Sequence, residues 1–133
     1  MLGYTENNTQ VEEFLTKLKS ILCSDKFDIN RDLEVLFSLT EGTPGFMNAQ
    51  TLGDLGCTIA DVRDTLLSLT VQDYSETMFD NRELTGPGFR VFGRSIKKKE
   101  VYIKVKIRKR ENNDVFCISF HYSQYPISYP FKV

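Results

Sequence analysis

The segment EVYIKVKIRKR, residues 100–110, has the residue pattern that decides the fold. Apolar and polar side chains alternate along it, and the two sets are Val101, Ile103, Val105, Ile107 and Tyr102, Lys104, Lys106, Arg108. A period of two predicts a strand with one face against a core and the other toward water. The segments FRVFGRSI (89–96) and DVFCISFHY (114–122) also predict strands, and the links between the three are short enough for antiparallel hairpins.

The chain before residue 80 instead shows helical spacing. Asn8 or Thr9 can cap a helix that ends near Cys23 and buries one apolar face. Gly56 ends a second, short helix, and Thr58 with Asp61 forms a capping box for a third. A last helical turn is expected from Thr70 through Tyr74, and turn-forming residues predict loops at 40–48 and 80–88. We therefore predict one α+β domain over residues 1–133, with N-terminal helices packed on a small antiparallel sheet.

Composition narrows the class of protein. The chain is 41% hydrophobic and 26% charged, as in ordinary globular proteins. The three cysteines Cys23, Cys57 and Cys117 are scattered without CxxC spacing, which argues against a disulfide framework and a zinc site. The N-terminus has no signal-peptide pattern, and no apolar run approaches the ~20 residues that span a bilayer. We expect a cytoplasmic protein without metal, cofactor or membrane partner.

Charge is divided unevenly along the chain. Residues 1–85 hold six Lys/Arg and fifteen Asp/Glu, whereas residues 86–133 hold eleven and three, so the halves carry −9 and +8. This asymmetry suggests that the second half binds an anion, although two solvated halves that attract each other would show it too.

The three strands are predicted to gather the positive charge on one sheet face. In the third strand Phe116, Ile118 and Phe120 are assigned to the core, so that His121 joins the polar set. In the first strand Phe89 and Val91 are assigned to the core, although Phe92 and Ile96 share the parity of the two arginines. The predicted face carries Arg90, Arg94, Tyr102, Lys104, Lys106, Arg108 and His121. Such a face suits RNA, because cations neutralise phosphates and aromatic rings stack on unpaired bases. The alternative is structural, since exposed strands often carry lysines that prevent another strand from pairing with the sheet edge.

The same residues could cleave RNA without a metal. His121, the one histidine, can act as general base or acid at neutral pH, with Tyr102 as a second proton donor or substrate orienter. Lys104 can stabilise the negative charge of the reacting phosphate, and Arg90, Arg94, Lys106 and Arg108 are the candidate RNA-binding residues. A lone histidine at a strand end is also commonly structural. Pro126 and Pro130 end the sheet, and Tyr125, Tyr129 and Phe131 are expected to pack over the strand end and to position His121.

The motifs TLGDLGCTIADVRDTLLSLTVQDYSETM, RVFGRSI, EVYIKVKI and VFCISFHYSQYPISYPF together resemble the MqsR toxin family, over residues 51–131. The resemblance implies a RelE-like fold, ribosome-independent cleavage of mRNA, and neutralisation by a cognate antitoxin protein. Tyr102 and Lys104 match the family's VY(L/I)K strand, and His121 stands where the family has the lysine that closes SFK. Glu76 replaces a functional lysine, Arg90 stands where related sequences have tryptophan, and residues 36–47 resemble an insertion.

Two other functions remain open from the sequence. Glu76 and Arg90, which depart from the family pattern, would suit a degenerate module that binds RNA or protein without cutting. The acidic first half and the insertion at 36–47 would suit a regulatory inhibitor protein that binds a partner.

Overall fold

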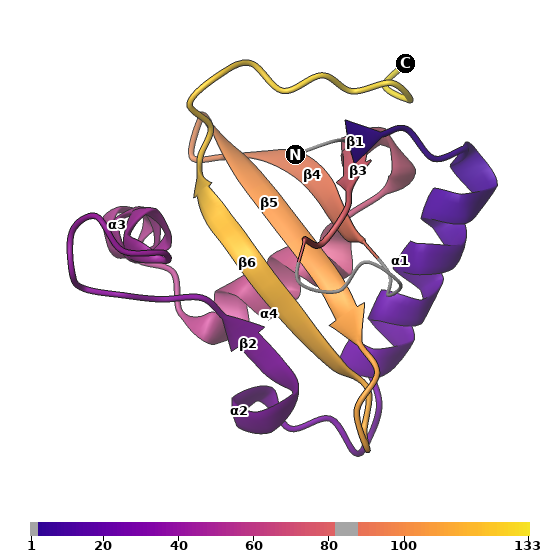
Figure 1. The fold of residues 1–133 in the computed structure, drawn as a ribbon, viewed down its shortest axis with the longest axis horizontal. Coiled ribbons are helices and arrows are strands. Elements are labelled where there is room, and N and C mark those ends of the chain that lie inside the picture. The colour runs from indigo at the N-terminus through magenta and orange to yellow at the C-terminus, as the bar shows by residue number, and fades with distance from the viewer. Residues whose placement is uncertain (1–2, 82–87) are drawn as a thin grey trace.

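The computed structural model describes residues 3–81 and 88–133, and it confirms the α+β class. Within these residues the strands form one six-stranded sheet in the order β1-β3-β4-β5-β6-β2 (Figure 1). Their bounds are Gly3–Tyr4 (β1), Leu33–Val35 (β2), Tyr74–Met78 (β3), Phe89–Ile96 (β4), Lys99–Arg108 (β5) and Asp114–Tyr122 (β6). Neighbouring strands are antiparallel except β2, which runs parallel to β6.

The predicted meander corresponds to β4, β5 and β6. A tight turn joins β4 to β5, and its residues Lys97 and Lys98 both have positive φ, 50° and 70°. Two consecutive left-handed residues are what a type I′ hairpin turn requires, although Asn-Gly is the usual sequence there. The loop predicted at residues 80–88 lies mostly outside the described residues.

The helices are α1 (Asn8–Leu22), α2 (Ile29–Asp32), α3 (Phe46–Leu55), α4 (Ile59–Ser68) and the 3₁₀ turn η1 (Val71–Asp73). Asn7, rather than Asn8 or Thr9, caps α1 through a reciprocal pair of hydrogen bonds with Gln10. Thr58 and Asp61 form the predicted capping box of α4. Helix α3 ends at Gly56 as predicted, but it already begins inside the segment 40–48 that was predicted to be a loop.

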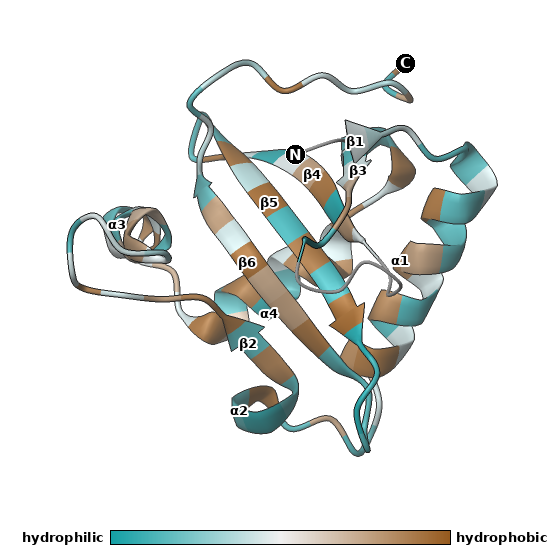
Figure 2. Ribbon diagram, in the orientation of Figure 1, coloured by the Kyte–Doolittle hydropathy of each residue, from teal (hydrophilic) through white to brown (hydrophobic). Residues whose placement is uncertain are grey.

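One face of the sheet packs against α1 and α4, and we call it the helix face. It carries the buried side chains Val101, Ile103 and Val105 of β5, and Phe92 of β4 stacks there on Phe14 of α1 at 6.2 Å. Figure 2 shows the alternation of hydrophobic and hydrophilic residues along β5. The opposite face, which carries Tyr102, Lys104 and Lys106, is called the Tyr102 face.

Beyond the residues that pair with β2, side chains of helix α3 form hydrogen bonds with the edge of β6. The amide nitrogen of Asn48 donates to the carbonyls of Leu36 and Ile118, and its amide oxygen accepts from the backbone N–H of Phe120. One turn later the hydroxyl of Thr51 accepts from the backbone N–H of Tyr122. These side chains satisfy the edge of β6 that would otherwise be open to further strand pairing.

Within the described residues, no helix has the length and apolar content that crossing a bilayer requires.

Candidate functional site

A β-bulge in β6 corrects the predicted faces of that strand. Lys104 lies opposite Ser119, but Val105 lies opposite Cys117, so Ile118 is an extra residue. One extra residue reverses the side-chain parity beyond it. Cys117 is therefore buried on the helix face and Phe116 lies on the Tyr102 face, the reverse of the prediction. His121, on the other side of the bulge, lies opposite Tyr102 as predicted.

The prediction that Arg90 and Arg94 share a face with Tyr102 is wrong. Arg90 lies opposite Val105 and Arg94 opposite Val101, so both belong to the helix face. The cause is Phe92, which has their parity and fills the core, and this places Phe89 and Val91 on the Tyr102 face.

Both arginines are also paired with acids. Arg90 bonds Glu6 at 2.8 Å and lies over the ring of Phe14. Arg94 bonds Asp73 at 2.7 Å and the backbone oxygen of Ser68 at 2.9 Å. Arg90 therefore anchors the N-terminal segment to the sheet, and Arg94 anchors η1. Neither arginine is placed as part of a phosphate-binding surface.

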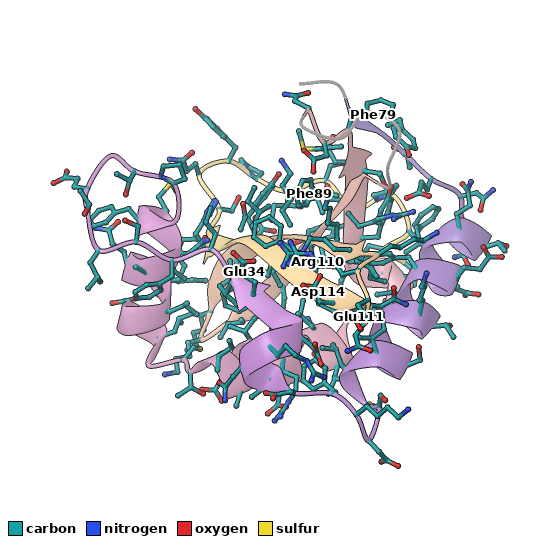
Figure 3. All side chains as sticks on the ribbon, turned by 60° about the horizontal axis from the view of Figure 1, so that its bottom comes forward. Glu34, Phe79, Phe89, Arg110, Glu111 and Asp114 are labelled. Carbon is teal, nitrogen blue, oxygen red and sulfur yellow. The ribbon has the colours of Figure 1, made fainter. Side chains whose placement is uncertain are left out.

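Lys106 and Arg108 lie on the predicted face, but acidic partners hold them as well. The Lys106 ammonium is 2.7 Å from a carboxylate oxygen of Asp80, and both side chains are buried. Arg108 binds Asp114 with two nitrogens at 2.8 Å and Glu34 at 2.9 Å, which raises its pKa further. Glu34 and Asp114 share Arg108 Nη2 as a donor, and Arg110 is 3.7 Å from Asp114 (Figure 3). A continuous basic face, as the sequence predicted, is therefore not present among the described residues.

Tyr102 and His121 form the centre of the candidate site. Their rings stack with centroids 5.4 Å apart and planes inclined by 18°. Nδ1 of His121 is 3.0 Å from the carbonyl oxygen of Tyr122. Since a carbonyl can only accept, Nδ1 carries the proton in the neutral ring and Nε2 keeps its lone pair. Burial, with a smaller contribution from the charge of Glu76, raises the pKa of Tyr102, so its phenol remains protonated at neutral pH.

The stacked rings line a cavity of about 460 Å³. The other side chains around it come from β3 and from the segment after β6: Ser75, Glu76, Ser123, Gln124, Tyr125, Pro126, Ile127 and Ser128. Sequence reasoning noted Glu76 only as a departure from a family pattern. A second bulge, at Ser75, explains its position: Tyr74 faces the core opposite Phe92, whereas Glu76 lies opposite Val91 on the Tyr102 face.

The C-terminal segment is held over the end of the sheet by Glu100. Its carboxylate accepts hydrogen bonds from the Tyr129 hydroxyl at 2.7 Å and from the Ile127 N–H at 3.2 Å. Gly93 makes the close approach possible, because a Cβ there would overlap the Tyr129 hydroxyl. Phe131 stacks on Tyr74, as the predicted packing of the tail requires, but Tyr125 is 81% exposed. The segment from Ser123 to Ser128 thus forms one wall of the cavity.

Lys104 is less central than predicted. It lies two residues along β5 from Tyr102, on the same face. Its ammonium, however, is 5.4 Å from the centroid of the Phe89 ring, and Lys104 does not line the cavity. Burial lowers its pKa, while the charges of Glu76 and Asp80 act in the opposite direction. The structure therefore brings Tyr102 and His121 together, with Lys104 beside them.

The fold and the site define an α+β protein with a Tyr–His cavity on its sheet. Comparison with known proteins gives no significant match, whether to family models, to curated proteins or to solved structures. Function must therefore be inferred from the geometry of the site and from the motifs of the chain.

Proposed function

We propose that this chain is an endoribonuclease that cleaves mRNA without a metal ion, at the cavity lined by Tyr102 and His121. The observation that carries the proposal is the stacked pair itself, at the cavity. The contact of Nδ1 with the Tyr122 carbonyl leaves the lone pair of the neutral ring on Nε2, and burial keeps the Tyr102 phenol protonated. The motifs that resemble the MqsR family extend the proposal to a RelE-like fold and to a toxin of a type II toxin–antitoxin system. On this proposal a cognate antitoxin is the protein partner.

The reaction needs a base, an acid and a positive charge. Nε2 of His121 removes the proton of a ribose 2′-OH, the 2′-oxygen bonds to phosphorus, and the bond from phosphorus to the 5′-oxygen breaks. Tyr102 gives its phenolic proton to the departing 5′-oxygen and later regains one from the histidine through water. Lys104 lies about 7 Å along the strand from Tyr102. On this proposal its ammonium turns from the Phe89 ring toward the cavity when RNA binds and stabilises the charge on the phosphorane. The products are a 2′,3′-cyclic phosphate and a 5′-hydroxyl.

The test uses single-stranded RNA in EDTA with three variants. His121→Ala should slow cleavage by about 100-fold or more, the usual effect of losing a general acid or base. Tyr102→Phe should also slow it, while keeping the ring stack. The matched control is Tyr122→Phe, because that hydroxyl bonds Asp54 away from the cavity. If His121→Ala cleaves as fast as the wild-type protein, the proposal is wrong.

A second candidate function is supported by the paired cations. Arg90, Arg94, Lys106 and Arg108 all contact carboxylates, which reduces the charge available to phosphates. A module that binds RNA or a protein without cutting would tolerate this arrangement. RNA binding without turnover, with a shallow dependence on salt, would favour it over the ribonuclease.

A regulatory inhibitor is the remaining alternative. The insertion at 36–47 exposes Phe37 by 54% and Leu39 by 81%, and a protein partner would cover such apolar side chains. Expression in bacteria separates this role from a toxin: a toxin arrests growth, and His121→Ala relieves the arrest, whereas an inhibitor that acts through residues 36–47 does not depend on His121.

A further inference from the structure

The cavity beside the stacked rings is larger than a phosphate group requires. Its volume of about 460 Å³ lies within the range of about 300–1,000 Å³ that is usual for small-molecule sites. We propose that it is a nucleobase subsite in which the Glu76 carboxylate selects bases that carry an exocyclic amino group. This inference rests on the proposed function and names the part of the substrate that its site recognises.

The lining suits a flat heteroaromatic ring. Tyr102 and His121 supply aromatic surface, and proteins hold unpaired bases mainly by stacking them on such rings. Tyr125 also lines the cavity and is 81% exposed, so its ring is available to cover a bound base from the solvent side. The backbone wall from Ser123 to Ser128 is fixed by Glu100, which keeps the cavity formed before a ligand enters.

Glu76 supplies the selectivity. An ionised carboxylate can only accept hydrogen bonds, whereas the serine hydroxyls of the same cavity can both donate and accept. Cytosine presents a 4-amino donor where uracil presents a carbonyl oxygen, and adenine differs from hypoxanthine in the same way. A carboxylate oxygen that faces this exocyclic group attracts the amino-bearing base of each pair and repels its carbonyl counterpart. A carboxylate that faced the neighbouring ring nitrogen would instead favour uracil and hypoxanthine, which carry an N–H there.

Two backbone features place the carboxylate. The bulge at Ser75 turns Glu76 from the helix face to the Tyr102 face. Gly3 of β1 then leaves room for the carboxylate, because a Cβ on Gly3 would overlap Oε1 of Glu76. Gly3→Ala consequently displaces the carboxylate without changing residue 76.

The test is a calorimetric titration with 3′-CMP and 3′-UMP, which have no bond that the proposed reaction can cleave. The wild-type protein should bind 3′-CMP about five- to 100-fold more tightly than 3′-UMP, the range expected for one base-reading contact. The pair 3′-AMP and 3′-IMP should show the same order. Glu76→Gln should abolish both preferences, because an amide can turn either its oxygen or its NH₂ toward the base.

Three further variants make the result specific. Glu76→Asp should keep the order of preference, and Gly3→Ala should weaken it while the protein still unfolds in one cooperative transition. Glu12→Gln, which removes an exposed carboxylate on α1, should behave like the wild-type protein. Equal binding of 3′-CMP and 3′-UMP, or a preference that survives Glu76→Gln, would overturn the inference.

The outcomes also separate this inference from the proposed function. Selective nucleotide binding without RNA cleavage would refute the ribonuclease and leave the subsite standing. RNA cleavage that depends on His121, together with unselective binding, would refute the subsite alone.

Discussion

Glu6 joins the N-terminal segment to the sheet, and its replacement by glutamine tests the described packing most simply. The side chain is 6% exposed, and Oε1 accepts from Arg90 Nε at 2.8 Å and from the Thr77 hydroxyl at 2.5 Å. Oε2 accepts from Arg90 Nη2 at 3.2 Å. In Glu6→Gln an NH₂ group replaces one of these oxygens and faces a guanidinium donor, so one charge-assisted bond and the ion pair are lost.

The magnitude follows from the burial of the partner. Breaking a fully buried pair costs about 3–5 kcal/mol, but the Arg90 side chain remains 18% exposed and water can reach it. We therefore expect Glu6→Gln to lower the free energy of unfolding by about 2–3 kcal/mol in urea titrations. The control Glu13→Gln, at an exposed position of α1, should stay within about 0.5 kcal/mol of the wild-type protein.

The pH dependence has a defined sign. Burial acts to raise the pKa of Glu6, but the hydrogen bonds from Arg90 and Thr77 and the charge of Arg90 outweigh it and lower the pKa in the fold. A lowered pKa means that the stabilisation is complete above the unfolded value of about 4.3 and is lost as pH falls through the folded value. The difference between the wild-type protein and Glu6→Gln should therefore narrow below about pH 4. A difference under about 0.5 kcal/mol at pH 7 would refute the account, because it would show that Glu6 is not held in this pair.

Three other substitutions test the turn, the sheet edge and the tail. Lys98→Gly should raise the free energy of unfolding by about 0.5–1 kcal/mol, because φ at this residue is 70°, and a decrease in urea titrations would contradict the left-handed turn. Asn48→Ala should lower it by about 2 kcal/mol and speed amide exchange at Phe120, whose N–H loses its acceptor; unchanged exchange would count against the edge cap. Gly93→Ala should displace Tyr129 and expose the C-terminal segment to chymotrypsin, whereas unchanged resistance would contradict the tail packing.

The sequence was sufficient for the parts of the fold that depend on local pattern. The alternation at residues 100–110 predicted β5, and the Thr58–Asp61 capping box predicted the start of α4. Strand β2 could not be assigned in this way. The apolar residues at 33–39 suit either a helix or a strand, only three residues pair, and their partner β6 lies about 80 residues further along the chain. Strand β3 was missed because its first residue, Tyr74, was assigned to the end of a helical turn.

The errors in the site have two physical origins. A side-chain period of two predicts a face only while the register is unbroken, and bulges at Ser75 and Ile118 each reverse it. They place Cys117 in the core, against expectation, and Glu76 at the cavity, for which the sequence had given no position. The face of Arg90 could have been predicted correctly from the sequence. Phe92 shares its parity, and a phenylalanine is more readily buried than an arginine.

The most direct test of the central claim is the chemistry of the RNA ends, measured by mass spectrometry after incubation with the wild-type protein in EDTA. Attack by the 2′-oxygen with His121 as base predicts fragments that end in 2′,3′-cyclic phosphate and fragments that begin with a 5′-hydroxyl. Both should form about 100-fold or more slowly with His121→Ala. Fragments with 3′-hydroxyl and 5′-phosphate ends, or intact RNA, would contradict the assignment of Tyr102 and His121 as a ribonuclease site.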